Sequence, residues 1–127
     1  MILLTILGLL FVAASSVAES IMDITNFHYD KSIFSQNTYK QTFWDPNKSW
    51  VNKWKSDLKT ERFLGSSTIF VFTTDAWHLF KFFRNTFLFI GLPLLSLGSM
   101  NILLAVIIAR IIYGLVFTFC FDKLFVK

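Results

Sequence analysis

The chain has 127 residues, a hydrophobic content of 54% and a mean hydropathy of +0.57. A chain of this length forms one domain at most, and its apolar fraction exceeds what a soluble domain of that size buries, which excludes an ordinary soluble globular protein. The net charge of +4 is carried mainly by scattered lysines rather than by an arginine-rich or glycine-rich stretch, so nucleic acid is not an expected partner. The sequence predicts an all-α integral membrane protein.

The first apolar segment, residues 2–22, is long enough for a transmembrane helix, which needs about 20 mostly apolar residues. Ser16 and Ala18 also satisfy the small-residue rule for signal peptidase. The alternative is therefore a cleaved signal over residues 1–18, which would leave a two-helix membrane protein with an external loop. A secretory signal begins with a positive region, but no Lys or Arg precedes Lys31. We therefore prefer a retained helix.

The connecting segment, residues 31–67, is the most basic part of the chain. Lys and Arg concentrate in the cytoplasmic loops of membrane proteins, so we expect this loop and the C-terminal tail to be cytoplasmic and the N-terminus to lie outside. The cations of the loop are Lys31, Lys40, Lys48, Lys53, Lys55, Lys59 and Arg62.

Within this loop the sequence predicts a short amphipathic helix over residues 46–59. Asp45 and Pro46 form an N-cap and first-turn pair, and Trp50 and Trp54 recur at helical spacing. Such a helix can lie in the membrane plane and offer lysine to anionic headgroups, or it can pack on the bundle as a surface helix. The expected membrane-interface residues are Trp44, Trp50, Trp54 and Trp77.

Two further apolar segments, residues 69–97 and 102–121, complete three predicted transmembrane helices. The second segment is longer than the hydrocarbon needs, so either it tilts or a new helix starts at Ala76 after a cap at Asp75. The connection between the two segments is short, which predicts an antiparallel helical hairpin.

Charged residues inside these apolar segments are the most informative feature of the sequence. An ionisable group at bilayer depth costs at least about 2.5 kcal/mol to insert, so it generally faces protein or water and finds a partner. Arg110 lies deeper than the others and has no evident partner in the chain. The remaining residues are expected to form one polar cluster, a candidate docking site: Glu19, Asp23, Asp75, His78, Lys81 and Arg84.

The cluster has a structural interpretation, in which salt bridges fix helix register, and a functional one, in which it forms a proton path or a docking site. A metal site built on Asp75, His78 and Glu19 is disfavoured, because two separated histidines and one Cys120 supply few ligands. The sequence contains no Gly-x-Ser-x-Gly elbow and no phosphate-binding loop, so neither an enzyme nor a cofactor is expected.

Three stretches of the sequence resemble small bacterial membrane proteins to which no function has been assigned. They are FHYDKSIF at residues 27–34, SWVNKWK at 49–55 and SSTIFVFTTDAWHLFKF at 66–82. The resemblance covers most of the chain and implies no activity. The bacterial inner membrane is the expected location.

The sequence therefore predicts a small accessory or scaffold protein of the membrane that docks another membrane subunit or a second copy of itself. The unpartnered Arg110 favours this interpretation. The alternative is an oligomer that conducts ions or protons, with Asp75, His78 and Glu19 lining the path, or one that permeabilises the membrane.

Overall fold

The computed structural model describes residues 1–36, 40–98 and 101–127. Over these ranges the chain is helical, with no strand and two isolated β-bridges. Each of the three long helices is apolar and long enough to cross a membrane, so the all-α fold with three transmembrane helices is confirmed. They are α1 (Ile2–Phe27), α4 (Ala76–Gly98) and α5 (Ile102–Phe119), which continues as a π-helical turn, η6 (Cys120–Leu124).

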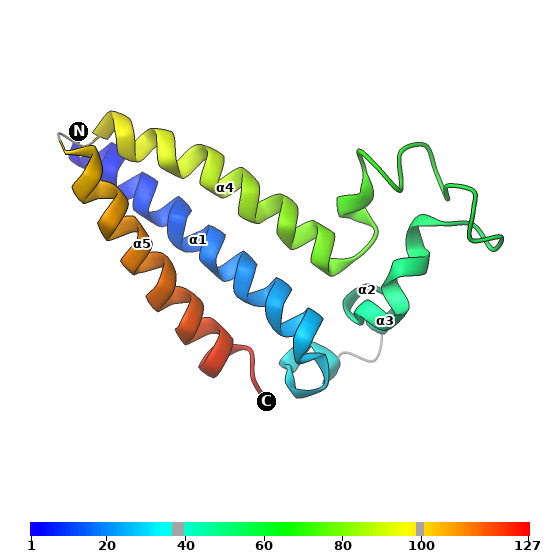
Figure 1. Ribbon diagram of the computed structural model, residues 1–127. Helices are drawn as coiled ribbons and strands as arrows, with labels where there is room; N and C mark the ends of the chain where they lie inside the picture. The colour runs from blue at the N-terminus through cyan, green and yellow to red at the C-terminus, as the bar shows by residue number, and fades with distance from the viewer. Residues whose placement is uncertain (37–39, 99–100) are drawn as a thin grey trace.

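Helix α1 lies between the other two long helices (Figure 1). It runs antiparallel to α4 and parallel to α5, and it packs against both. The α4 and α5 helices are joined at one end as the predicted hairpin, but they diverge from that end and contact each other little. The packing of both helices therefore depends on α1.

Glycines bring α1 and α4 into close contact. A Cβ atom on Gly8 would lie 2.7 Å from Cγ of Leu95 and 2.9 Å from the carbonyl oxygen of Gly91. A Cβ atom on Gly98 would lie 2.6 Å from the backbone nitrogen of Thr5. Small residues at a helix interface let the two backbones approach, which is how helices gain packing contacts inside lipid.

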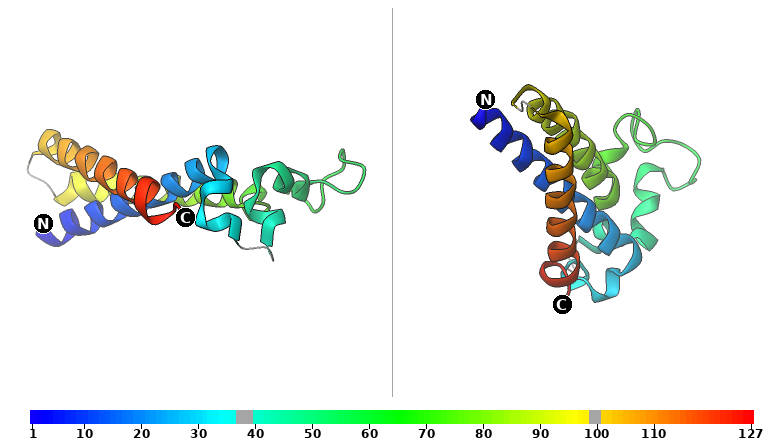
Figure 2. Two further views of the ribbon diagram at one scale, coloured as in Figure 1. Left: turned by 90° about the horizontal axis from the view of Figure 1, so that it is seen from below. Right: turned by 60° about the vertical axis from the view of Figure 1, so that its left-hand side comes forward.

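A hydrophobic core closes the end of the bundle at which α1 and α5 finish. Phe34 and Trp44 stack with ring centroids 4.5 Å apart and pack against this core. The backbone nitrogen of Lys127 donates to the carbonyl oxygen of Lys31 at 2.9 Å, so the C-terminal tail pairs with the chain that follows α1 (Figure 2). The buried residues of the core are Ile21, Ile24, Cys120 and Phe125.

The second predicted segment, residues 69–97, is divided in two. Its first part forms a short 3-10 turn, η5 (Val71–Thr73), and α4 then begins at Ala76. The Asp75 carboxylate accepts a hydrogen bond from the backbone nitrogen of His78 at 2.9 Å, as an N-cap does. Of the two alternatives for this segment, the new start at Ala76 is therefore the correct one.

The amphipathic helix predicted over residues 46–59 is shorter in the structure. Asp45 caps it as expected, but Trp54 is already extended and forms a bridge with Glu61. The Asp57 carboxylate accepts hydrogen bonds from the backbone nitrogens two and three residues on, and this local turn competes with the helix. The helical elements of the connecting segment are η1 (Tyr29–Lys31), η2 (Ile33–Gln36), α2 (Gln41–Trp44), α3 (Pro46–Ser49) and η4 (Trp50–Lys53).

Candidate functional site

Glu19 joins the three long helices. Its carboxylate accepts a hydrogen bond from Nη1 of Arg84 at 3.1 Å, which forms an ion pair between α1 and α4. The hydroxyl of Tyr113 on α5 donates to the other carboxylate oxygen. Arg84 also donates from Nε to the side-chain oxygen of Asn85 at 3.2 Å. Each charge thus has the partner that an apolar surrounding requires.

Two serines of α1 add further hydrogen bonds, one to α4 and one to α5. The hydroxyl of Ser15 donates to the backbone carbonyl of Arg84 at 2.9 Å, and the hydroxyl of Ser16 donates to the backbone carbonyl of Tyr113 at 2.6 Å. Both serines are fully buried. Hydroxyl groups that bond to a neighbouring helix stabilise helix pairs inside membranes.

The predicted polar cluster is divided into two separate pairs. Glu19 and Arg84 form one, and Asp75 and His78 form the other, with Nδ1 of His78 2.7 Å from Oδ2 of Asp75. His78 and Arg84 lie about 9 Å apart along the helix axis at 1.5 Å per residue. In the parts of the chain that the structure describes, no hydrogen bond or ion pair links the two pairs.

Asp23 and Lys81 belong to neither pair. Asp23 lies one helical turn beyond Glu19, within range of electrostatic interaction with it and with Arg84, but has no hydrogen bond to either among the described residues. The Nζ of Lys81 lies 4.7 Å from the ring centroid of Trp77, a cation–π contact at the start of α4.

The tryptophans predicted for the membrane interface lie at the end of the bundle where the long loop joins α4. Trp44 stacks on Phe34 and is half-buried, whereas Trp50 is exposed. Trp54 is half-buried in the extended chain after η4, and Trp77 lies under Lys81 in the first turn of α4.

The Asp75–His78 pair borders a small cavity of about 160 Å³ where the long loop meets α1 and α4. The side-chain amide of Asn52 donates to the backbone carbonyls of Thr42 at 2.6 Å and Thr74 at 2.9 Å, which fixes the loop against the start of α4. Among the described residues, no group of three or more His, Cys, Asp and Glu is placed to hold a metal ion.

Arg110 differs from the other arginine of the spans. Its side chain is exposed on α5, and no acidic residue pairs with it in the described ranges. It lies about 12 Å from the start and about 21 Å from the end of the span Ile102–Leu124, at 1.5 Å per residue. Nη1 lies over Gly114, because a Cβ atom there would be 3.3 Å from this nitrogen.

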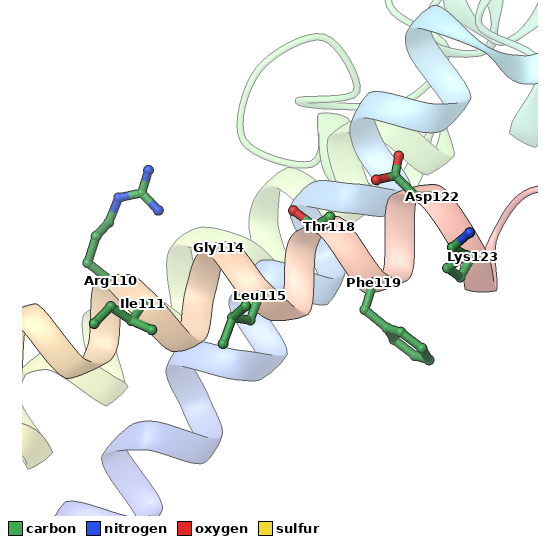
Figure 3. Close-up of a pocket in the computed structure, with 8 residues that line it drawn as sticks. All are labelled: Arg110, Ile111, Gly114, Leu115, Thr118, Phe119, Asp122 and Lys123. Atoms are coloured by element: carbon green, nitrogen blue, oxygen red, sulfur yellow. The ribbon is translucent and has the colours of Figure 1, made fainter.

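Arg110 begins a stripe of residues spaced four apart on the outer face of α5. Figure 3 shows Arg110, Thr118 and Asp122 projecting from one side of the helix, while Ile111, Leu115 and Phe119 project from another. Residues four apart form the ridges through which helices pack together. A shallow groove of about 670 Å³ follows this face. We call the residues that line this groove the α5 outer face: Arg110, Ile111, Gly114, Leu115, Thr118, Phe119, Asp122 and Lys123.

Three residues of the interhelical contact were not predicted from the sequence. Ser15 and Ser16 belong to a run of small residues that fits a signal peptidase site equally well, so their bonding role was not apparent. Tyr113 offered a signal, because a hydroxyl group in an otherwise apolar helix needs a partner.

Comparison of the chain with protein-family models, with curated proteins and with solved structures finds no match.

Proposed function

We propose that this protein is an accessory or scaffold component of a membrane assembly, and that the α5 outer face docks a transmembrane helix of another subunit. The observation that carries the proposal is Arg110, a mid-span guanidinium without an acidic partner in the described ranges. Arg84, by contrast, is paired with Glu19. An arginine facing lipid near mid-membrane costs about 2.5 kcal/mol or more, which a carboxylate from a neighbouring helix would offset.

The expected partner carries Asp or Glu at the depth of Arg110. A second copy in the same orientation offers Glu19 near this depth, since Glu19 bonds to Tyr113, one turn from Arg110. That carboxylate already accepts hydrogen bonds from Arg84 and Tyr113. A different membrane subunit therefore satisfies Arg110 without opening the bundle of this chain.

We place the protein in a bacterial inner membrane, with the long loop and the C-terminal tail on the cytoplasmic side. The bond between Lys127 and Lys31 supports this, because it puts the basic loop and the tail at one end of the bundle. Collecting Lys and Arg on one side is typical of cytoplasmic segments.

The packing of α1 supports a folded protein that keeps residues 1–18. Val12, Ser15, Ser16 and Ala18 are buried against the other two helices or within the bundle. Removing this segment would leave α4 and α5 with little contact between them. Intact-mass measurement of the protein purified from membranes tests this point directly.

The docking proposal is tested by photo-crosslinking in native membranes. A photoreactive amino acid at Leu115, on the α5 outer face, should give an adduct with another membrane protein. The same probe at Phe89, which is exposed on α4, serves as the matched control and should give none. Arg110→Leu should abolish the adduct, whereas Arg110→Lys, which keeps the charge, should retain part of it. An adduct that persists unchanged in Arg110→Leu contradicts the proposal.

Ion conduction receives less support from the geometry. Asp75 and His78 pair at the start of α4, while Glu19 is engaged by Arg84 and Tyr113, so the three candidate groups do not form one row. Vesicles reconstituted with the protein should show no proton flux between about pH 5 and pH 8, the range in which histidine titrates.

A further inference from the structure

The segment from Lys53 to Phe70 forms an ordered loop outside the three spans, to the side of the start of α4 (Figure 1). Ser66 holds its two limbs together and is fully buried. Its hydroxyl donates to the carbonyl oxygen of Lys53 at 2.7 Å and accepts from the backbone nitrogen of Arg62 at 3.1 Å. We call this segment the 53–70 loop.

A carboxylate on the inside of the loop orders its turn. Glu61 accepts hydrogen bonds from the backbone nitrogens of Gly65 at 3.0 Å and Ser67 at 3.1 Å, and from the hydroxyl of Ser67. These bonds, that from the Ser67 hydroxyl first, lower the pKa of Glu61. Gly65 adopts φ 77°, which suits glycine. The turn is therefore pre-formed by polar groups that face inward.

The same turn exposes its apolar side chains. Leu64 is 90% exposed and Ile69 is 77% exposed, and Phe63 and Phe70 are also exposed. Ser66 and Glu61 thus bond inward in this turn while its large apolar side chains are exposed, which is unusual for a surface turn. Apolar side chains gathered on a surface in this way mark an interaction site.

The loop also carries a concentration of positive charge. Basic side chains next to exposed apolar ones are the combination with which peripheral segments bind membranes, because lysine and arginine contact anionic headgroups while the apolar groups enter the interface. The cations of the loop are Lys53, Lys55, Lys59 and Arg62, and with the carboxylates of Asp57 and Glu61, which bond to the loop's own backbone, its net charge is positive.

Aromatic contacts connect the apolar side of the loop to the membrane span. The rings of Phe70 and Phe72 lie 6.4 Å apart, and Phe72 stacks on Phe82 of α4 with centroids 4.5 Å apart. Phe82 is itself exposed on the span. The apolar surface of the loop is thus continuous with a helix surface that faces lipid, which favours the bilayer over a protein as its partner.

We propose that the 53–70 loop binds the surface of the same bilayer that the helices cross, with Leu64 and Ile69 entering the headgroup region. Lys53 and Arg62, which adjoin this apolar turn, contact anionic lipid, whereas the Asp57 turn stays in water. This assigns the lipid contact to a pre-formed loop rather than to a helix over residues 46–59. It does not depend on the docking role of Arg110.

A fluorescent probe on the full-length chain tests the proposal. In a Cys120→Ser background, Leu64→Cys is labelled with an environment-sensitive dye, and the protein is reconstituted into vesicles of phosphatidylcholine and phosphatidylglycerol. Nitroxide-bearing lipids should quench this dye several-fold more than a dye at Lys59→Cys, in the Asp57 turn of the same loop. Iodide in the water should quench the dye at position 64 less than the dye at position 59.

Two further variants make the test specific. Glu61→Gln, which weakens the inner bonds of the turn, should reduce quenching of the position-64 dye by nitroxide lipid. Arg110→Leu should leave it unchanged, which separates this proposal from the docking proposal. A position-64 dye that iodide reaches as readily as the dye at position 59 overturns the proposal. So does a dye shielded from both quenchers, because protein would then cover the loop.

Discussion

Glu19 and Arg84, which are 65 residues apart in the sequence, form an ion pair at 3.1 Å between α1 and α4. Tyr113 of α5 bonds to the same carboxylate. This one carboxylate therefore links all three helices and, together with the glycine contacts between α1 and α4, sets how they are rotated about their axes.

Replacing the carboxylate should loosen the bundle. Glu19→Gln leaves Arg84 without a counter-charge, and we expect the free energy of unfolding in mixed micelles to fall by about 1–2 kcal/mol. Tyr113→Phe removes one hydrogen bond and keeps the ion pair, so its loss should be nearer about 0.6 kcal/mol. If Tyr113→Phe lowered the free energy of unfolding more than Glu19→Gln, the hydrogen bond from Tyr113 would matter more than the ion pair, contrary to this prediction.

The ion pair should also show coupling between its members. Glu19→Leu and Arg84→Leu each leave one charge unpaired, whereas the double variant leaves none. We expect the double variant to be more stable than either single variant in the same unfolding measurement. Simple additivity of the two losses would indicate that the charges do not interact.

Alanine at the crossing of α1 and α4 should force the helices apart. In Gly8→Ala the new Cβ meets Leu95 and the backbone of Gly91, and we expect a loss of about 1–3 kcal/mol in the free energy of unfolding. Gly114→Ala is the matched control, because its Cβ meets only the flexible end of Arg110 at 3.3 Å. Equal losses in the two variants would argue against a close contact at Gly8.

Two substitutions of Asp75 distinguish the effect of its N-cap hydrogen bond from the effect of its negative charge. Asp75→Ala removes the acceptor for the backbone nitrogen of His78, and we expect a loss of about 1 kcal/mol, visible as faster hydrogen exchange at the His78 amide. Asp75→Asn keeps an acceptor and loses the charge opposite the imidazole, so protection at this amide should largely persist. Equally fast exchange in both variants would mean that the contact between the carboxylate and the imidazole, not the cap, protects the helix start.

Acid should loosen the turn at Asp57. Hydrogen bonds from the Thr60 hydroxyl and the backbone nitrogens of Thr60 and Lys59 lower the pKa of Asp57 from its ordinary value of 3.8 to about 2. Because the folded-state pKa is the lower one, the contribution to stability is complete above 3.8 and disappears as the pH falls towards 2. NMR titration of the Asp57 carboxyl group and of the Thr60 amide should follow this range. Asp57→Asn should remove the transition.

The spans and the caps could be predicted because they depend on local sequence. The length of an apolar segment is enough to predict a transmembrane helix. An Asp directly before a helix start is a common N-cap, which is why the caps Asp45 and Asp75 could be predicted. The predicted helix over residues 46–59 was too long. Hydrophobic periodicity carries no information about the hydrogen bonds between the Asp57 carboxylate and the nearby backbone, which form a turn there instead of a helix.

The arrangement of the charged residues could not be predicted in the same way. Depth along the helices placed Glu19 and Asp23 at about the level of the stripe from Asp75 to Arg84, but depth does not specify how each helix is rotated. That rotation depends on glycines far apart in the sequence, Gly8 and Gly91, whose contact no local pattern reveals. The predicted single cluster is divided into two pairs because its members in α4 are spread along the helix, with His78 and Arg84 about 9 Å apart along the axis at 1.5 Å per residue.

The central place of α1 bears on the order in which the protein assembles. Of the three long helices, α1 is synthesised before the other two, and both of them pack against it, whereas α4 and α5 contact each other little. We therefore expect the hairpin of α4 and α5 to become ordered in the bilayer when it packs against α1. A chain cut within the long loop should still assemble when its two pieces are produced together, since non-covalent contacts rather than the connection carry the recognition.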